Sequence, residues 1–109
     1  MNDIKFAIAG TAAEEAARSL FEIDGLQGDY AQDSEVTRDG GLTVIATVVG
    51  LVGGTMAIAE QIRKWYEEYR SKQGVKKIEK VLIVTPNGRL LLENATIEEI
   101  AKVLAPLAK

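Results

Sequence analysis

The stretch 77–92, KIEKVLIVTPNGRLLL, predicts a β-hairpin and sets the fold class. Its two arms, 77–84 and 90–92, are rich in the β-branched and apolar residues that are typical of strands. Between the arms, Pro86 fixes φ, and Gly88 can take the positive φ that a tight turn with a bulge requires. We therefore predict a C-terminal hairpin in which Gly88 is a structural glycine.

A final helix is expected after the hairpin. Thr96 and Glu99 have the spacing of a capping box, in which each side chain accepts a hydrogen bond from the backbone amide of the other residue. Beyond Thr96, apolar residues recur at helical spacing along one face: Ile97, Ile100, Ala101, Leu104 and Leu107. We predict a helix here, with Thr96 as its N-cap.

The N-terminal part predicts a strand and then a helix. Apolar residues alternate with other residues over about 3–9, which is the pattern of a strand with one buried face. Thr11 and Glu14 repeat the capping-box spacing, so we expect a helix over 12–23 with Thr11 as its cap. Sparse apolar residues over 29–37 predict a weak or edge strand.

The central segment is compatible with three structures: a buried helix, a membrane span, or a strand followed by a helix. Residues 40–59 carry no charge, and an apolar stretch of this length suits either a buried helix or a membrane span. Residues 42–49 are β-branched, which favours a strand, whereas 57–70 has the pattern of a helix. We favour a helix throughout 42–72. The alternative is a strand over 42–49, a glycine turn and then a helix.

Three glycines in the charge-free segment are predicted to be structural. Within a buried helix, Gly50, Gly53 and Gly54 would let another element pack closely. Gly50 and Gly54 also have the G-x-x-x-G spacing that favours helix association in membranes. The run lacks the lysine of a phosphate-binding loop, so we expect packing and not phosphate binding.

These elements predict one α+β domain over residues 1–109. The expected order is β-α-β-α-β-β-α, with three helices packed on a small sheet that includes the C-terminal hairpin. No proline- or serine-rich linker and no repeat divides the chain.

Composition argues against several classes of function. The chain has 109 residues and a net charge of −3, which argues against an electrostatic nucleic-acid binder. It has no cysteine and no histidine, so thiolate and imidazole chemistry is excluded, and we expect neither catalysis, nor a metal, nor another cofactor. Paired glutamates such as Glu67-Glu68 are expected to be solvated helix faces. The N-terminus lacks the pattern of a secretory signal, so we expect a cytoplasmic protein.

One aromatic cluster stands out as a candidate interaction site. Trp, Tyr and Arg dominate the energetics of protein interfaces, and five such residues fall close together: Arg63, Trp65, Tyr66, Tyr69 and Arg70. Trp65 and Tyr69 share one helix face, and we expect Trp65 to be mostly buried. Tyr66, Arg63 and Arg70 are expected to be more exposed and available to a partner.

The order of these pieces resembles a family of short bacterial proteins, the effector-associated constant components of NTP-dependent conflict systems. The likeness rests on segments spread along most of the chain: the strand ending at Gly10, the helix with Arg18-Ser19-Leu20-Phe21-Glu22, Gly40-Gly41-Leu42, Gly53-Gly54 before a helix with Ala57, Ala59, Ile62 and Trp65, the hairpin Val84-Thr85-Pro86-Asn87-Gly88-Arg89, and a leucine-rich final helix. The family hairpin reads Val-Thr-Gly-Pro-Asp-Gly-Arg, so this one is shorter. The resemblance implies a non-catalytic component that is encoded beside a variable effector.

Two functions from different classes follow. The first is a protein-interaction component that binds an effector or sensor protein encoded nearby and can also self-associate, through the aromatic cluster or an unpaired sheet edge. The second is a membrane-active or pore-forming component of the inner membrane that spans the bilayer through 42–59.

Overall fold

The computed structural model describes residues 4–32, 42–71, 78–86 and 88–107. The elements in chain order are β1 (Ile4–Gly10), α1 (Ala13–Leu20), β2 (Leu26–Gln32), β3 (Leu42–Leu51), α2 (Thr55–Ser71), β4 (Ile78–Thr85), β5 (Gly88–Leu91), the short 3-10 helix η1 (Leu92–Asn94), α3 (Ile97–Leu104) and the 3-10 helix η2 (Ala105–Leu107). The α+β class, the three helices and the C-terminal hairpin are confirmed. The order matches the expected one, with one additional strand, β3.

The strands form one antiparallel sheet in the order β2-β3-β1-β4-β5. The first strand in the sequence is therefore the central strand of the sheet, with β3 on one side and β4 on the other. The strand predicted over 29–37 is β2, which lies at one edge of the sheet as expected but begins earlier, at Leu26. The other edge is β5.

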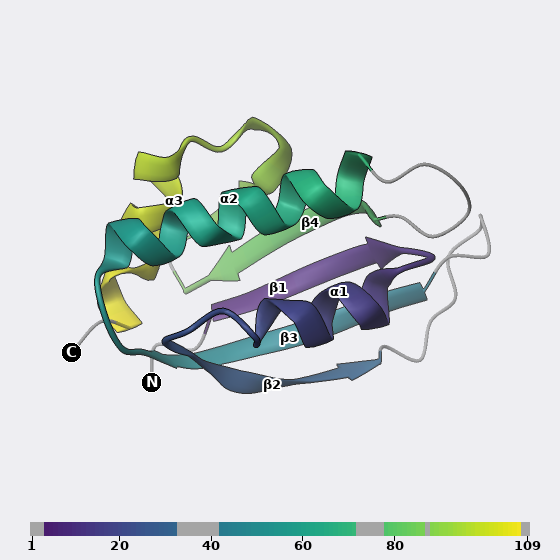
Figure 1. Ribbon diagram of the computed structural model, residues 1–109, viewed down its shortest axis with the longest axis horizontal. Coiled ribbons are helices and arrows are strands. Elements are labelled where there is room, and N and C mark those ends of the chain that lie inside the picture. Colours follow the sequence, from purple (N-terminus) through teal and green to yellow (C-terminus); the bar gives the residue numbers. More distant parts are fainter. Residues whose placement is uncertain (1–3, 33–41, 72–77, 87, 108–109) are drawn as a thin grey trace.

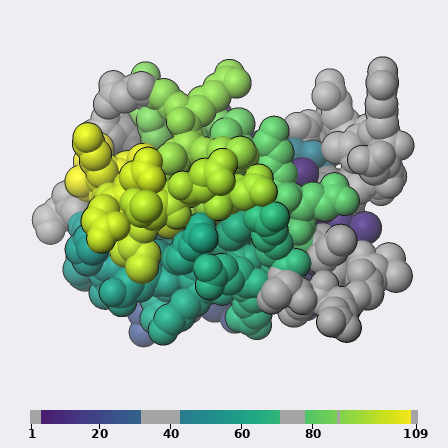
Figure 2. Space-filling view, turned by 90° about the horizontal axis from the view of Figure 1, so that it is seen from above, coloured from purple at the N-terminus to yellow at the C-terminus, as the bar shows by residue number. Residues whose placement is uncertain are grey.

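The helices cover one face of this sheet. Alternate residues of β1, Ile4, Phe6 and Ile8, are buried on that face, because successive side chains of a strand point to opposite sides. Figure 1 shows α1 and α2 lying in front of the sheet, with α3 passing behind the left end of α2. Figure 2 shows α3 packed beside α2. The buried stripes of the helices, such as Leu20 and Ile62, complete a single core cluster.

The favoured helix over 42–72 is wrong in its first part. Residues 42–51 form β3, a chain reversal follows, and α2 begins at Thr55, so the alternative interpretation is confirmed. The physical reason is pairing on both sides. β3 lies between β1 and β2, so its backbone groups find partners in two neighbouring strands while its β-branched residues pack on the sheet. No helix in the described ranges is long and apolar enough to cross a membrane.

The roles expected for the three central glycines change accordingly. Gly53 has φ +113° in the turn between β3 and α2, a conformation that side chains disfavour. Gly50 lies within β3, where an added Cβ would approach the side-chain oxygen of Gln27, and Gly54 has only the Ala57 methyl nearby. Gly50 and Gly54 therefore do not share a helix, and the expected close helix packing is wrong. The positive φ of Gly88, at +151°, is confirmed.

The two predicted caps have different outcomes. At α3, Thr96 Oγ1 accepts from the Glu99 amide at 3.1 Å and Glu99 Oε1 accepts from the Thr96 amide at 3.0 Å, which confirms the capping box. At α1, Ala12 holds the N-cap position without a side-chain cap, so the Thr11 cap is wrong. The reason is that β1 continues through Gly10 and Thr11 lies in a turn, which delays the helix until the buried Ala13.

Candidate functional site

The predicted interaction cluster lies on α2, and most of it faces inward. Trp65 is 4% exposed, as expected, but Tyr66 is only 2% exposed and Tyr69 only 5%. The expectation that Tyr66 is exposed is therefore wrong. Only Arg63 and Arg70 retain substantial solvent contact, with 28% and 48% of their side chains exposed.

Trp65 connects α2 to α1. Its indole Nε1 donates a hydrogen bond of 2.8 Å to the carbonyl oxygen of Ala16, and its ring lies 6.3 Å from that of Tyr69. Indole N–H groups that are buried normally find such a partner, because an unsatisfied donor is costly. The aromatic face of α2 thus holds the two helices together.

Arg63 connects α2 to the segment before α3. Its Nη1 donates to the carbonyl oxygens of Leu92 at 2.9 Å and Ala95 at 3.1 Å, while its Nε pairs with Glu67 at 3.2 Å. These two carbonyls belong to η1 and its C-cap, and the Leu92 carbonyl also accepts from the Ala95 amide at 3.2 Å. The guanidinium therefore satisfies backbone acceptors of the same chain.

Arg70 has a similar internal role near the C-terminal end of α2. It donates to the Tyr66 hydroxyl at 3.0 Å and to Glu93 at 3.1 Å, and its guanidinium carbon lies 5.8 Å from the Tyr66 ring centroid. The Tyr66 hydrogen bond is the main cause that raises the pKa of Arg70 above its ordinary value. The residues chosen from the sequence are brought together, but by packing within the chain.

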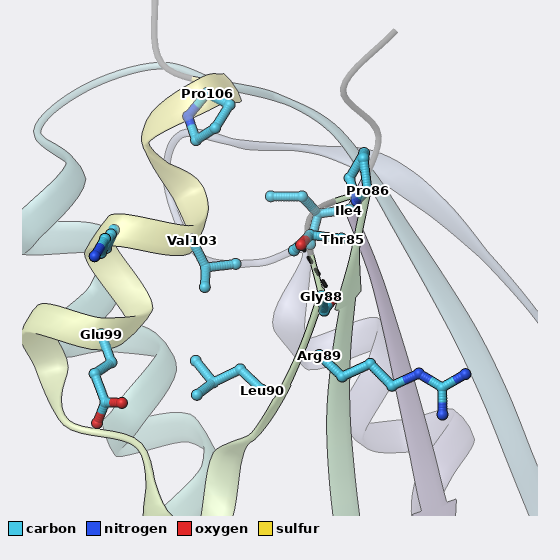
Figure 3. Close-up of a pocket in the computed structure, with 10 residues that line it drawn as sticks. Ile4, Thr85, Pro86, Gly88, Arg89, Leu90, Glu99, Val103 and Pro106 are labelled. Atoms are coloured by element: carbon cyan, nitrogen blue, oxygen red, sulfur yellow. Dashed lines mark hydrogen bonds between the residues drawn. The ribbon is translucent and has the colours of Figure 1, made fainter.

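A groove lies between the hairpin and α3 (Figure 3). Its volume is about 460 Å³, within the range of small-ligand pockets, and apolar side chains from three elements line it: Ile4, Leu90 and Val103. Pro86 and Pro106 lie at its upper end in Figure 3. Glu99 lines it too, but its carboxylate is engaged in the α3 capping box, and Arg89 points away from α3. The groove can accept an apolar side chain, Lys102 also lines it, and the described residues form no cluster that could hold a metal ion.

The sheet face opposite the helices carries a feature that we did not predict from the sequence. The strand register places five apolar side chains in one row across all five strands: Ala31, Ile45, Ala7, Leu82 and Leu91. We call this set the apolar row. Each member is exposed or half-buried, and no described helix packs on this face. Antiparallel sheets with one solvated face normally alternate apolar-in and polar-out, and the apolar row departs from that pattern.

Charged residues border the apolar row on both of its long sides. Lys5 and Arg89 lie on one side, in the register Lys5↔Val84↔Arg89, and Asp29 lies at the β2 end of the same line. Lys80 lies on the other side, opposite Ala9. All four charged side chains are exposed.

Three large apolar side chains outside the apolar row are also exposed. Val49 is 56% exposed, and Val52 and Met56 are 60% and 47% exposed. Val49 occupies the open face of β3, since its neighbour Val48 is buried under the helices. A hint was present in the sequence, because β4 reads Val81-Leu82-Ile83-Val84 without polar alternation, which is typical of a strand covered on both faces.

The glutamate pairs of the three helices are exposed, as expected for solvated helix faces. Comparisons with protein-family models, with curated proteins and with solved structures find no match to this chain.

Proposed function

We propose that this chain is a non-catalytic protein-binding component that docks a partner on the open face of its sheet. The single observation that supports this proposal is the apolar row. A strip of apolar side chains that crosses every strand and is bordered by charges has the composition of an interaction surface, with an apolar centre and a polar rim.

The partner that we propose is an effector or sensor protein encoded beside this chain, in a bacterial conflict system and in the cytoplasm. The neighbouring partner and the conflict system come from the family resemblance. The open face takes the place of the aromatic cluster as the docking surface, because Trp65, Tyr66 and Tyr69 are engaged in the core.

The test is co-purification with the products of the neighbouring genes. An Ile45→Thr/Leu82→Thr variant replaces the two large apolar residues on either side of Ala7 in the apolar row with threonine, a β-branched residue that suits a strand. We expect an unchanged melting transition and a loss of affinity of roughly thirtyfold, which corresponds to about 2 kcal/mol at an interface hot spot.

The matched control is Met56→Gln, which removes an exposed apolar side chain from α2. It should bind as the unmodified chain does. If the double variant is folded and still retains its partner at full affinity, the open face is not the docking surface. Light scattering on the same samples reports whether the face instead joins two copies of the chain.

A further inference from the structure

The charges of the described residues are distributed unevenly between the two sides of the molecule. The open face carries three basic residues, Lys5, Lys80 and Arg89, and one acidic residue, Asp29. Glu79 is exposed beside Lys80, where the pairing of β1 with β4 is irregular. The helices and the segments next to them carry most of the described acidic residues: Glu14, Glu15, Glu22, Asp24, Glu60, Glu67, Glu68, Glu93, Glu98 and Glu99. Their described basic residues are Arg18, Arg63, Lys64, Arg70 and Lys102. In a chain of net charge −3, the open face is thus the basic side.

We propose that the open face binds an amphipathic segment whose apolar stripe is flanked by acidic residues. This inference rests on the proposed function and names the chemistry of its partner. The apolar row would cover the stripe, while Lys5 and Arg89 on one side and Lys80 on the other would face the acidic flanks. Complementary charges at the rim of an interface raise the association rate and select against partners with the wrong charge.

A second copy of the chain fits this face less well. Stacking two open faces about an axis along β1 brings Lys5 of one copy over Lys5 of the other and Asp29 of each copy opposite Arg89 of the other. Both faces carry the same excess of basic over acidic described residues, so their net charges do not complement each other. The acidic helix side of another copy has the right charge, but its large apolar stripe residues, such as Leu20 and Ile62, are buried in its own core. A separate partner segment supplies both the charge and the apolar stripe.

An anionic membrane surface also combines negative charge with an apolar layer, but the face lacks the side chains that insert there. Aromatic residues favour membrane interfaces, and the described aromatic residues all lie elsewhere. Phe6, Trp65, Tyr66 and Tyr69 are buried in the core, and Phe21 stacks on Tyr30 at the helix-covered side of β2. The partner segment is therefore the better match.

The test uses two synthetic amphipathic helical peptides that share one leucine stripe, with glutamates flanking it in the first and lysines in the second. Fluorescence anisotropy with the full chain should show that the glutamate peptide binds at least about tenfold more tightly, and that added salt weakens its binding. A Lys5→Glu/Arg89→Glu variant should reverse the preference. The control variant Glu14→Lys/Glu15→Lys, on the exposed surface of α1, should leave it unchanged.

Several outcomes overturn the inference. Equal affinity for the two peptides, binding of neither peptide, or a preference that survives the Lys5→Glu/Arg89→Glu change would each do so. Binding to phosphatidylglycerol vesicles without binding to the glutamate peptide would point to a membrane instead. The proposed function fails separately. If the natural partner is lost with Ile45→Thr/Leu82→Thr but kept with Lys5→Glu/Arg89→Glu, the docking surface stands and its charge selectivity is wrong.

Discussion

Trp65 and Ala16, which lie 49 residues apart in the chain, are joined by a hydrogen bond of 2.8 Å from the indole nitrogen to the backbone carbonyl oxygen. This contact fixes α2 against α1 on the helix-covered side of the sheet. It also explains why the tryptophan belongs to the core, although its residue type is common at interfaces.

A Trp65→Phe variant should therefore destabilise the fold. The change removes the indole donor and part of the ring volume at a site that is only 4% exposed. We expect a loss of roughly 1–3 kcal/mol in the free energy of unfolding, measured by urea denaturation. Lys64→Gln, at an exposed position of the same helix, is the control and should change stability by less than about 0.5 kcal/mol. Equal stability of both variants would contradict the role assigned to the indole.

Tyr66 and Arg70 should behave differently from each other, although they form a hydrogen bond. Tyr66→Ala empties a buried site and should cost roughly 3–5 kcal/mol, in line with other aromatic-to-alanine changes in cores. Arg70→Ala removes an exposed ion pair with Glu93 and should cost no more than about 1 kcal/mol. Thermal melts of the two single variants check this difference, and similar melting temperatures would show that Tyr66 is not a core residue.

Gly53 and Gly54 provide a matched pair in the turn before α2. Gly53→Ala should destabilise by about 1–2 kcal/mol, because a side chain is strained at φ +113° even though the surrounding space is open. Gly54→Ala should cost less, no more than about 1 kcal/mol. Gly54 has no positive φ and an added Cβ would meet only the Ala57 methyl at 3.9 Å, so the loss comes only from alanine being a poorer N-cap than glycine. Chemical denaturation of both variants is the measurement, and a reversed order of stability would contradict the turn geometry.

Thr96 should contribute to stability through its hydroxyl. Thr96→Ala removes the acceptor for the Glu99 amide and should cost about 1 kcal/mol. Thr96→Ser keeps a hydroxyl at the N-cap and should retain most of the stability. Unfolding curves in urea distinguish the two, and an equal loss in both variants would mean that the methyl group, not the cap, is what matters.

The sequence alone determined the features that depend on near neighbours. Pro86 and Gly88 set the hairpin, Thr96 and Glu99 set the start of α3, and alternation set β1, because each of these signals acts within a few residues. The α+β class followed from such local signals.

Tertiary structure decided the rest, because it depends on partners that are distant in the sequence. Residues 42–51 could bury their apolar side chains as a helix or as a strand, and only pairing with β1 and β2 on both sides made them β3. Tyr66 directly follows Trp65 in the sequence, so it lies beside the helix face that Trp65 and Tyr69 share. It is buried because α2 packs against the sheet and also against α3, so that two of its faces are covered. The apolar row is decided in the same way, because five separate strands place its members side by side only in the register of the folded sheet.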